Sequence, residues 1–287
     1  MTRITTITSG LEGVGKTQIA VNLTLELVRR GHFAGLFSDV DAFNALDSLL
    51  TLSAAGQVPQ RRTDDIPSSD LVRRGYQGAD LLGCRQQLDD WPGCDAGWLQ
   101  NCIDDLDVRE EYDDLLIDTS AMSAQAVLSC CLVAGTVLLV VTPDPASQAQ
   151  AFALLRVLQL NGFSGSPRLI VNRADYAIDA REIQQSMQAL TRKHLGLDLP
   201  FLETIIEDPH VAMAMQYRQA FTTVFPDTEA SDSIVLIADQ FEGALARAGR
   251  AAQRQAAIWS ELYRLLARCM RLPGDAILQG SRSVVSD

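Results

Sequence analysis

The residues with the clearest chemical potential form an eight-residue loop near the N-terminus. Gly10 to Thr17 read G-L-E-G-V-G-K-T, which fits the phosphate-binding pattern G-x-x-x-x-G-K-[ST]. In such a loop, backbone N–H groups surround phosphates, because glycine lets the main chain approach them without a Cβ in the way. Lys16 would reach the β- and γ-phosphates, and the Thr17 hydroxyl would hold Mg²⁺. The loop therefore predicts nucleotide binding, and its alternative is a glycine-rich turn that caps a helix.

The elements around this loop are those that a phosphate-binding loop requires. A strand-like run, Arg3 to Thr8, precedes it, and a helical pattern, residues 18–30, follows it. Strand and helix patterns then alternate, which predicts an α/β fold: a doubly wound, mainly parallel sheet with helices on both faces. The predicted strands are Ile4 to Thr8, Ala34 to Asp39, Asp114 to Asp118, Thr136 to Thr142 and Arg168 to Asn172, with a further candidate at Leu199 to Ile205.

Polar residues follow several of these strands, where ligands of doubly wound sheets bind. They are the loop itself, Asp39 and Asp41, Asp118, Pro143, and Asn172 with Arg173. Because parallel strands end at the same edge, topology alone brings these residues together. Two other segments predict no site: residues 57–91 are expected to form an irregular surface excursion, and the acidic run Glu110-Glu111 and Asp113-Asp114 is expected to be a solvated turn.

Composition restricts the class of protein. Of 287 residues, 47% are hydrophobic, yet no run approaches the roughly 20 apolar residues that span a bilayer. The start of the chain shows no export signal, so we expect a cytoplasmic protein. The six cysteines include no C-x-x-C pair, which favours reduced, mostly buried thiols and no metal beyond nucleotide-bound Mg²⁺. The net charge of −12 disfavours DNA binding by the whole surface.

Four motifs resemble the MinD/ParA group of P-loop ATPases. They are the loop, Asp39-Val40-Asp41, the strand Leu115 to Asp118 with Thr119, and Val171-Asn172-Arg173. Within that group, residues 79–83 and 113–129 are most similar to the flagellar-number regulators FlhG and FleN. The resemblance covers roughly residues 1–240, which we expect to form a nucleotide-binding domain.

The resemblance implies ATP or ADP with Mg²⁺ as ligands and assigns roles to residues. Asp118 would hold the Mg²⁺ hydration shell, as a carboxylate suits this hard cation. Asp41 would orient the attacking water with Asp39 beside it near the metal, and Asn172 with Arg173 would contact the base. The alternatives are a capped strand-to-helix turn for the two aspartates and an ordinary strand end for Asn172. The residues expected to line the phosphates are Gly10, Leu11, Glu12, Gly13, Val14, Gly15, Lys16, Thr17 and Gln18.

Three positions depart from the family pattern. The family has a second lysine at the position of Leu11, and this lysine reaches the partner's phosphates in an ATP-dependent homodimer. A positive charge supplied in trans can raise the rate of phosphoryl transfer by ~10³ to 10⁵, so its loss predicts slow hydrolysis. Glu12 adds negative charge beside an anion unless it points to solvent. Met122 replaces a glycine whose amide senses the γ-phosphate.

The C-terminal region is predicted to form an amphipathic helical extension, residues 241–272, and a flexible tail, residues 273–287. Seven arginines and three acidic residues lie in 243–287. The helical face could contact an anionic membrane surface through residues 256–272, or pack on the domain or a partner helix. We expect a regulator that controls flagella or another polar machine through protein contacts. The alternatives are an active positioning ATPase for DNA or the septum and a pseudo-ATPase scaffold.

Overall fold

A computed structural model of the chain describes residues 3–38, 72–83 and 112–245. The expected Asp39 and Asp41 loop lies outside these ranges, as do the amphipathic face at 256–272 and the tail. The last described helix, α9, continues to Leu245, past the boundary expected after residue 240. The account of the fold and of the site rests on the described ranges.

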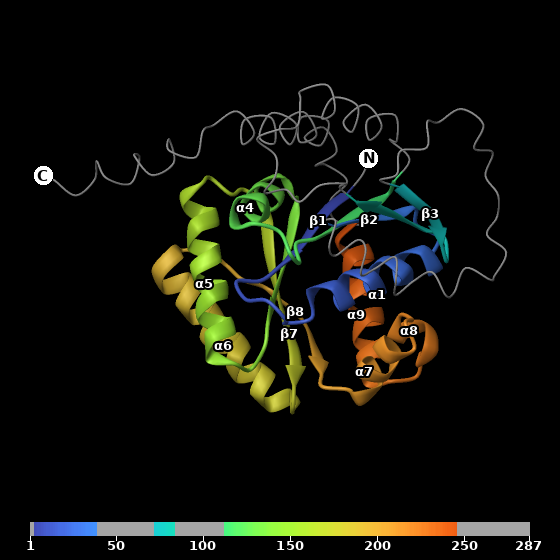
Figure 1. The fold of residues 1–287 in the computed structure, drawn as a ribbon. Coiled ribbons are helices and arrows are strands. Elements are labelled where there is room, and N and C mark those ends of the chain that lie inside the picture. The colour runs from blue at the N-terminus through green and yellow to red at the C-terminus, as the bar shows by residue number, and fades with distance from the viewer. Residues whose placement is uncertain (1–2, 39–71, 84–111, 246–287) are drawn as a thin grey trace, which may run out of the picture.

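Eight strands form one sheet in the order β3-β4-β2-β5-β1-β6-β7-β8, and β3 is antiparallel while the other seven strands run parallel (Figure 1). Aliphatic and β-branched residues dominate the central strands, where they are buried on both faces, as a covered parallel sheet requires. The predicted doubly wound sheet is confirmed. The strands are β1 (Arg3–Thr8), β2 (Ala34–Ser38), β3 (Val72–Tyr76), β4 (Ala79–Gly83), β5 (Asp114–Asp118), β6 (Thr136–Val141), β7 (Ser166–Ala174) and β8 (Phe201–Ile206).

Helices cover both faces of the sheet (Figure 1). On one face, α1 and α9 pack on the sheet in a hydrophobic cluster that includes Leu23, Leu36 and Ile234. On the other face, α4, α5 and α6 contribute to two further clusters. No helix among the described residues is long and apolar enough to span a membrane. The helices are α1 (Lys16–Arg29), α4 (Ala124–Val133), α5 (Pro145–Leu160), α6 (Ala177–Leu195), α7 (Pro209–Gln216), α8 (Phe221–Val224) and α9 (Glu229–Leu245).

The segment expected to be an irregular excursion, residues 57–91, contains two strands of the sheet. β4 lies beside β2 in parallel register, and β3 pairs with β4 through the tight turn at Gln77 and Gly78. Ala79, Leu81 and Leu82 are buried. The prediction was therefore wrong for residues 72–83, because a five-residue strand buried by its neighbours carries little periodicity of its own.

The acidic run before β5 is only partly solvated. Asp113 is exposed, as predicted, but Asp114 is 1% exposed. The Asp114 carboxylate accepts a hydrogen bond from Arg3 Nε and lies 2.7 Å from His32 Nδ1. The expectation of a solvated turn is therefore wrong for Asp114, which a cation from β1 and the His32 ring hold at the start of β5.

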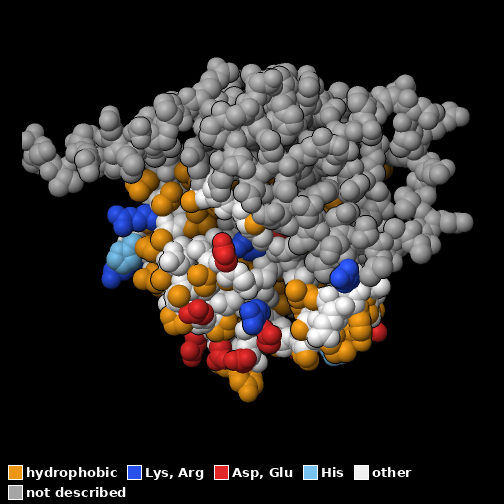
Figure 2. Space-filling model, viewed as in Figure 1, with side chains coloured by type: hydrophobic (Ala, Val, Ile, Leu, Met, Phe, Trp, Pro, Cys, Tyr) orange, Lys and Arg blue, Asp and Glu red, His pale blue; other side chains and the backbone are white. Residues whose placement is uncertain are grey.

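Apolar side chains are also exposed at the end of the molecule that carries α7 and α8. Figure 2 shows hydrophobic side chains gathered there, at the lower right of the view. The exposed apolar residues of this region are Met213, Met215 and Tyr217.

Candidate nucleotide-binding site

The loop between β1 and α1 has a shape that its glycines permit. Gly13 and Gly15 adopt the left-handed conformation, with φ of 73° and 96°. A Cβ on Gly10 would lie 2.2 Å from the main-chain carbon of Gln150, and a Cβ on Gly15 would lie 2.3 Å from Asn172 Nδ2. Glycine is therefore required at two of the motif positions by packing, and at Gly13 by its backbone conformation alone.

The loop ends at the N-terminus of α1, where backbone amides are free to bind an anion. Gly15 is the N-cap residue, and no side chain caps the helix. The first amides of a helix have no partner within it, and they carry the positive end of the helix dipole. A phosphate group suits this position.

Lys16 folds back over the loop. Its Nζ lies 3.2 Å from the carbonyl oxygen of Leu11 and 3.4 Å from the hydroxyl of Ser9. The same hydroxyl accepts a hydrogen bond from the Leu11 amide, so Ser9 braces the loop at its start. Burial lowers the pKa of the Lys16 ammonium, and the negative charges of Asp118 and Glu12 oppose this decrease. Lys16 therefore carries its positive charge in a buried position, where a bound anion would neutralise it.

Thr17 and Asp118 form the pair that could hold Mg²⁺. The Thr17 hydroxyl donates a hydrogen bond to Asp118 Oδ2 over 2.6 Å and also lies 2.9 Å from the Ser120 hydroxyl. Asp118 is fully buried at the end of β5, next to Ile7 of β1. These groups are hard oxygen ligands of the kind that Mg²⁺ prefers, and Mg²⁺ is commonly held by few protein groups together with phosphates and waters. The donor set therefore fits this ion.

Ser120 was not predicted as a site residue, yet it contacts Asp118 of the candidate Mg²⁺ pair. Its hydroxyl and its amide both donate to Asp118 Oδ1, over 2.8 Å and 3.0 Å. These two bonds fix the orientation of the carboxylate and leave its other oxygen for Thr17. The only signal in the sequence was the position of a hydroxyl residue two places after a strand-end aspartate.

The turn after β5 contains Met122, which stands where the family pattern has a glycine. The left-handed residue there is Ala121, with φ of 62°, and not Met122. Met122 is half-buried and packs against the cluster that contains Cys130, with the two sulfurs 4.0 Å apart. The thioether is thus directed into the protein. Cys130 and Cys131 are buried, and burial raises the pKa of the Cys131 thiol, as expected for packing residues.

Leu11 and Glu12 lie at the rim of the loop. Leu11 is half-buried and packs against the cluster beneath α1, whereas Glu12 is exposed. Because Glu12 is exposed to solvent, its negative charge is tolerated beside an anion bound in the loop. A leucine offers no charge to a neighbouring molecule, whatever its orientation.

Asn172 and Arg173 end β7 beside the loop. The Asn172 side chain is buried, and its Nδ2 donates to the Val14 carbonyl over 2.7 Å. Arg173 is exposed and pairs with Glu207. The structure therefore brings Asn172 to the loop and leaves Arg173 at the surface.

The start of α7 lies at the same edge of the sheet. Asp208 caps this helix by accepting from the His210 amide over 2.8 Å. Burial opposes ionisation of Asp208, but hydrogen bonds from the His210 amide and ring outweigh it and lower the pKa of the carboxyl. The edge thus carries the loop, Asp118, Asn172 and a capped helix start.

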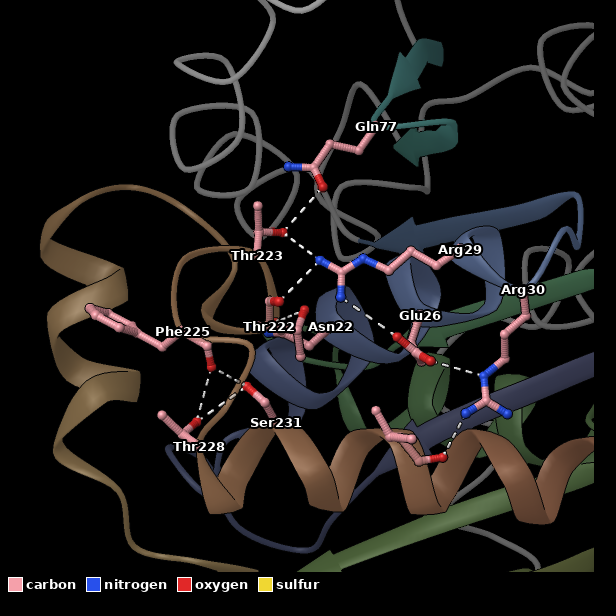
Figure 3. A network of polar contacts seen from close by, with 11 residues as sticks. Asn22, Glu26, Arg29, Arg30, Gln77, Thr222, Thr223, Phe225, Thr228 and Ser231 are labelled. Atoms are coloured by element: carbon pink, nitrogen blue, oxygen red, sulfur yellow. Dashed lines mark hydrogen bonds and ion pairs between the residues drawn. The ribbon is translucent and has the colours of Figure 1, made fainter.

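The helix that follows the loop is fastened along its length by polar contacts (Figure 3). The Asn22 carboxamide oxygen accepts from both the amide and the hydroxyl of Thr222, over 3.0 Å and 2.9 Å. One turn later, Glu26 pairs with Arg30, whose guanidinium also donates to the Val235 carbonyl on α9. α1 is therefore tied to α8 on one side and to α9 on the other.

Comparison with known proteins agrees with this geometry. No family model matches the chain. The antiactivator FleN of Pseudomonas aeruginosa is 27% identical over 249 residues, which cover 84% of this chain and 86% of FleN. The flagellum site-determining protein YlxH of Helicobacter pylori is 24% identical and is covered over 82% of its length. Among solved structures, the septum site-determining protein MinD of Pyrococcus horikoshii, complexed with Mg-ADP, has a TM-score of 0.62 at 22% identity and covers 87% of this chain and 100% of that one.

The fold and the loop are similar to those of the MinD/ParA-type P-loop ATPases. Within that type, the sequence is similar to proteins of the FlhG/FleN group, represented by YlxH and FleN. The resemblance found in the motifs is confirmed at both levels.

Proposed function

We propose that this chain is a nucleotide-binding regulator of flagellar number or placement, acting through protein contacts. The observation that carries the proposal is the contact of Thr17 with Asp118 beside the buried ammonium of Lys16. Three groups that would serve the metal and the phosphates come from the loop and from a strand more than a hundred residues away. The flagellar role is supported by two relatives, one named an antiactivator and the other a flagellum site-determining protein.

ATP or ADP with Mg²⁺ is the proposed ligand. Lys16 and the amides at the start of α1 would bind the phosphates, and Thr17 with Asp118 would hold the cation or its waters. Mg²⁺ would neutralise charge on the phosphates when bound. The free carboxamide oxygen of Asn172 would accept from the amino group of adenine, since the carboxamide nitrogen is engaged by Val14. Asp39 and Asp41 stay candidates for positioning the metal and the water.

Slow hydrolysis is part of the proposal. Leu11 supplies no cation to a partner, and Met122 stands where a glycine amide would approach the γ-phosphate. Positioning and charge neutralisation supply most of the catalysis of phosphoryl transfer, so both losses reduce the rate. An ATP-dependent homodimer, cytoplasmic residence and a peripheral membrane contact through residues 256–272 complete the proposal.

Nucleotide binding is tested by titration of the full chain with ATP and ADP in the presence of Mg²⁺. We expect the wild type to bind and the Lys16→Ala variant to lose most of its affinity, because the ammonium is the main charge that faces the phosphates. Lys193→Ala, at an exposed position on α6, is the matched control and should bind as the wild type does. Equal binding by the wild type and Lys16→Ala would contradict the proposal.

The cellular role is tested in the native organism. Replacement of the chromosomal copy by the Lys16→Ala variant should change the number or position of flagella counted by electron microscopy. An unchanged count, with the variant present at normal abundance, would refute the flagellar role and leave nucleotide binding standing.

A further inference from the structure

The side chain of Asn172 is attached to the phosphate-binding loop itself. Its Nδ2 lies 2.7 Å from the Val14 carbonyl oxygen, across 158 positions of sequence, and Asn172 is 7% exposed. The contact needs glycine as its neighbour, because a Cβ on Gly15 would stand 2.3 Å from the same nitrogen. The loop and the end of β7 are therefore built to fit each other.

The backbone of β7 aims this side chain. The pairing of β7 with β8 shifts register between Asn172 and Ala174, and the intervening Arg173 has a φ of 58°. An irregularity of this kind re-aims the side chains around it. Here Arg173 faces solvent, and Asn172 stays buried against the loop.

Only one orientation of the Asn172 carboxamide can form the hydrogen bond to the loop. If the amide turned over, its oxygen would face the Val14 carbonyl oxygen, and two acceptors would oppose each other without a hydrogen. The nitrogen therefore remains on Val14.

Fixing this carbonyl also fixes an amide of the loop. The Val14 carbonyl and the Gly15 N–H belong to one planar trans peptide unit, so they point in opposite directions. While Asn172 holds the carbonyl on the β7 side, the Gly15 N–H is directed away from β7. Gly15 is the N-cap of α1, where the amides are free for an anion.

We infer that Asn172 is a positioning residue for the phosphates, which acts by locking the Val14–Gly15 peptide unit of the loop. This role rests on the proposed nucleotide binding but differs from contact with the base. A residue that only reads the base affects ATP and adenosine. A residue that shapes the loop also affects a ligand made of phosphates alone.

The test uses inorganic tripolyphosphate with Mg²⁺ as the probe, measured on the full chain by competition against a fluorescent ADP analogue. Asn172→Ala and the similarly sized Asn172→Leu should both bind tripolyphosphate about fivefold to tenfold more weakly, the effect of losing one hydrogen bond. Asn161→Ala is the matched control, since Asn161 donates from its Nδ2 to the Val157 carbonyl over 2.8 Å at the exposed C-cap of α5. It should leave the affinity unchanged.

Two results separate this inference from the proposed function. If the Asn172 variants lose affinity for ATP and keep full affinity for tripolyphosphate, the inference is overturned, while nucleotide binding stands. If the wild type binds neither ligand, both ideas fail together. Thermal unfolding without ligand sets a temperature at which every variant is folded, and the affinities are compared there.

Discussion

Thr17 and Asp118, which are 101 positions apart in the chain, share a hydrogen bond of 2.6 Å at the junction of α1 and β5. Asp118 is fully buried, and the Ser120 amide and hydroxyl hold its second oxygen. The fold therefore holds the two side chains together, and a bound cation would replace or bridge this contact.

If Thr17 and Asp118 hold Mg²⁺, ATP binding should depend on this ion, and Asp118→Asn should remove the dependence. Asp118→Asn keeps the size of the side chain but removes the charge that a divalent cation needs. Mg²⁺ should strengthen ATP binding to the wild type by about tenfold or more and have little effect on the variant, as judged by titration calorimetry with Mg²⁺ and with EDTA. Asp198→Asn, at an exposed ion pair with Arg192, is the control. An equal effect of Mg²⁺ on wild type and Asp118→Asn would contradict the assignment.

Leu11 sets the expected rate of hydrolysis. Leu11→Lys restores a cation at the rim of the loop and should increase ATP hydrolysis or ATP-dependent dimerisation, with an upper range of ~10³ to 10⁵ in rate if the charge acts in trans. Phosphate release and light scattering after gel filtration measure the two effects. Leu11→Met, which keeps the position uncharged and similar in size, is the control and should leave both quantities unchanged. No increase in either quantity for Leu11→Lys would show that the leucine does not limit the rate.

The buried charge of Lys16 should favour the phosphate-bound protein and lower the stability of the ligand-free protein. Burial lowers the pKa of the folded-state ammonium, so the protonated form is less favourable in the folded than in the unfolded chain. This cost is fully present below the lowered pKa and disappears as pH rises from that value to the ordinary pKa of lysine. Lys16→Met should therefore raise the free energy of unfolding at neutral pH without ligand.

The measurement is urea unfolding of the ligand-free chain at neutral and at alkaline pH. The advantage of Lys16→Met over the wild type should shrink at alkaline pH, where the ammonium has lost its proton in both states. Lys193→Met, on the exposed surface of α6, serves as the control and should show no such trend. A variant that is less stable than the wild type at neutral pH would be evidence against a buried, unfavourable charge.

Asp114 is expected to matter for stability rather than for binding. Asp114→Asn leaves Arg3 and His32 without their carboxylate in a buried setting, and loss of one partner of a buried pair costs about 3 kcal/mol. Urea unfolding should show this decrease, while Asp113→Asn, one residue earlier and exposed, should cost less than about 1 kcal/mol. Similar losses for the two variants would contradict the structural assignment.

The sequence predicted the parts of the fold whose patterns are local. The loop motif, the β-branched run of β1, the aliphatic runs of β5 and β6, and the alternation with helices each follow from a few adjacent residues. β4 was missed, because its place beside β2 depends on burial by distant elements and not on its own composition. The buried state of Asp114 was missed for the same reason, since Arg3 and His32 reach it from elsewhere in the chain.

The residues of the candidate site also fall into two groups: those that a local motif predicts and those whose role depends on distant partners. Lys16, Thr17 and Asp118 were found because their residue types and positions in motifs specify their chemistry. Ser9 and Ser120 were missed, because a hydroxyl group has a role there only through the partners that the fold brings to it. The attachment of Asn172 to Val14 links residues 158 positions apart, and spacing carried no sign of it.

The polar fastening of α1 limits how this protein can signal. With Asn22 held by Thr222 and Arg30 attached to α9, the helix behind the phosphates is coupled to the body of the domain at two levels. A rigid helix of this kind does not slide when its N-terminus gains a ligand. If the proposed nucleotide binding is signalled to a partner, we therefore expect the signal to pass through the strand-end turns, such as the one where Ala121 adopts a left-handed backbone.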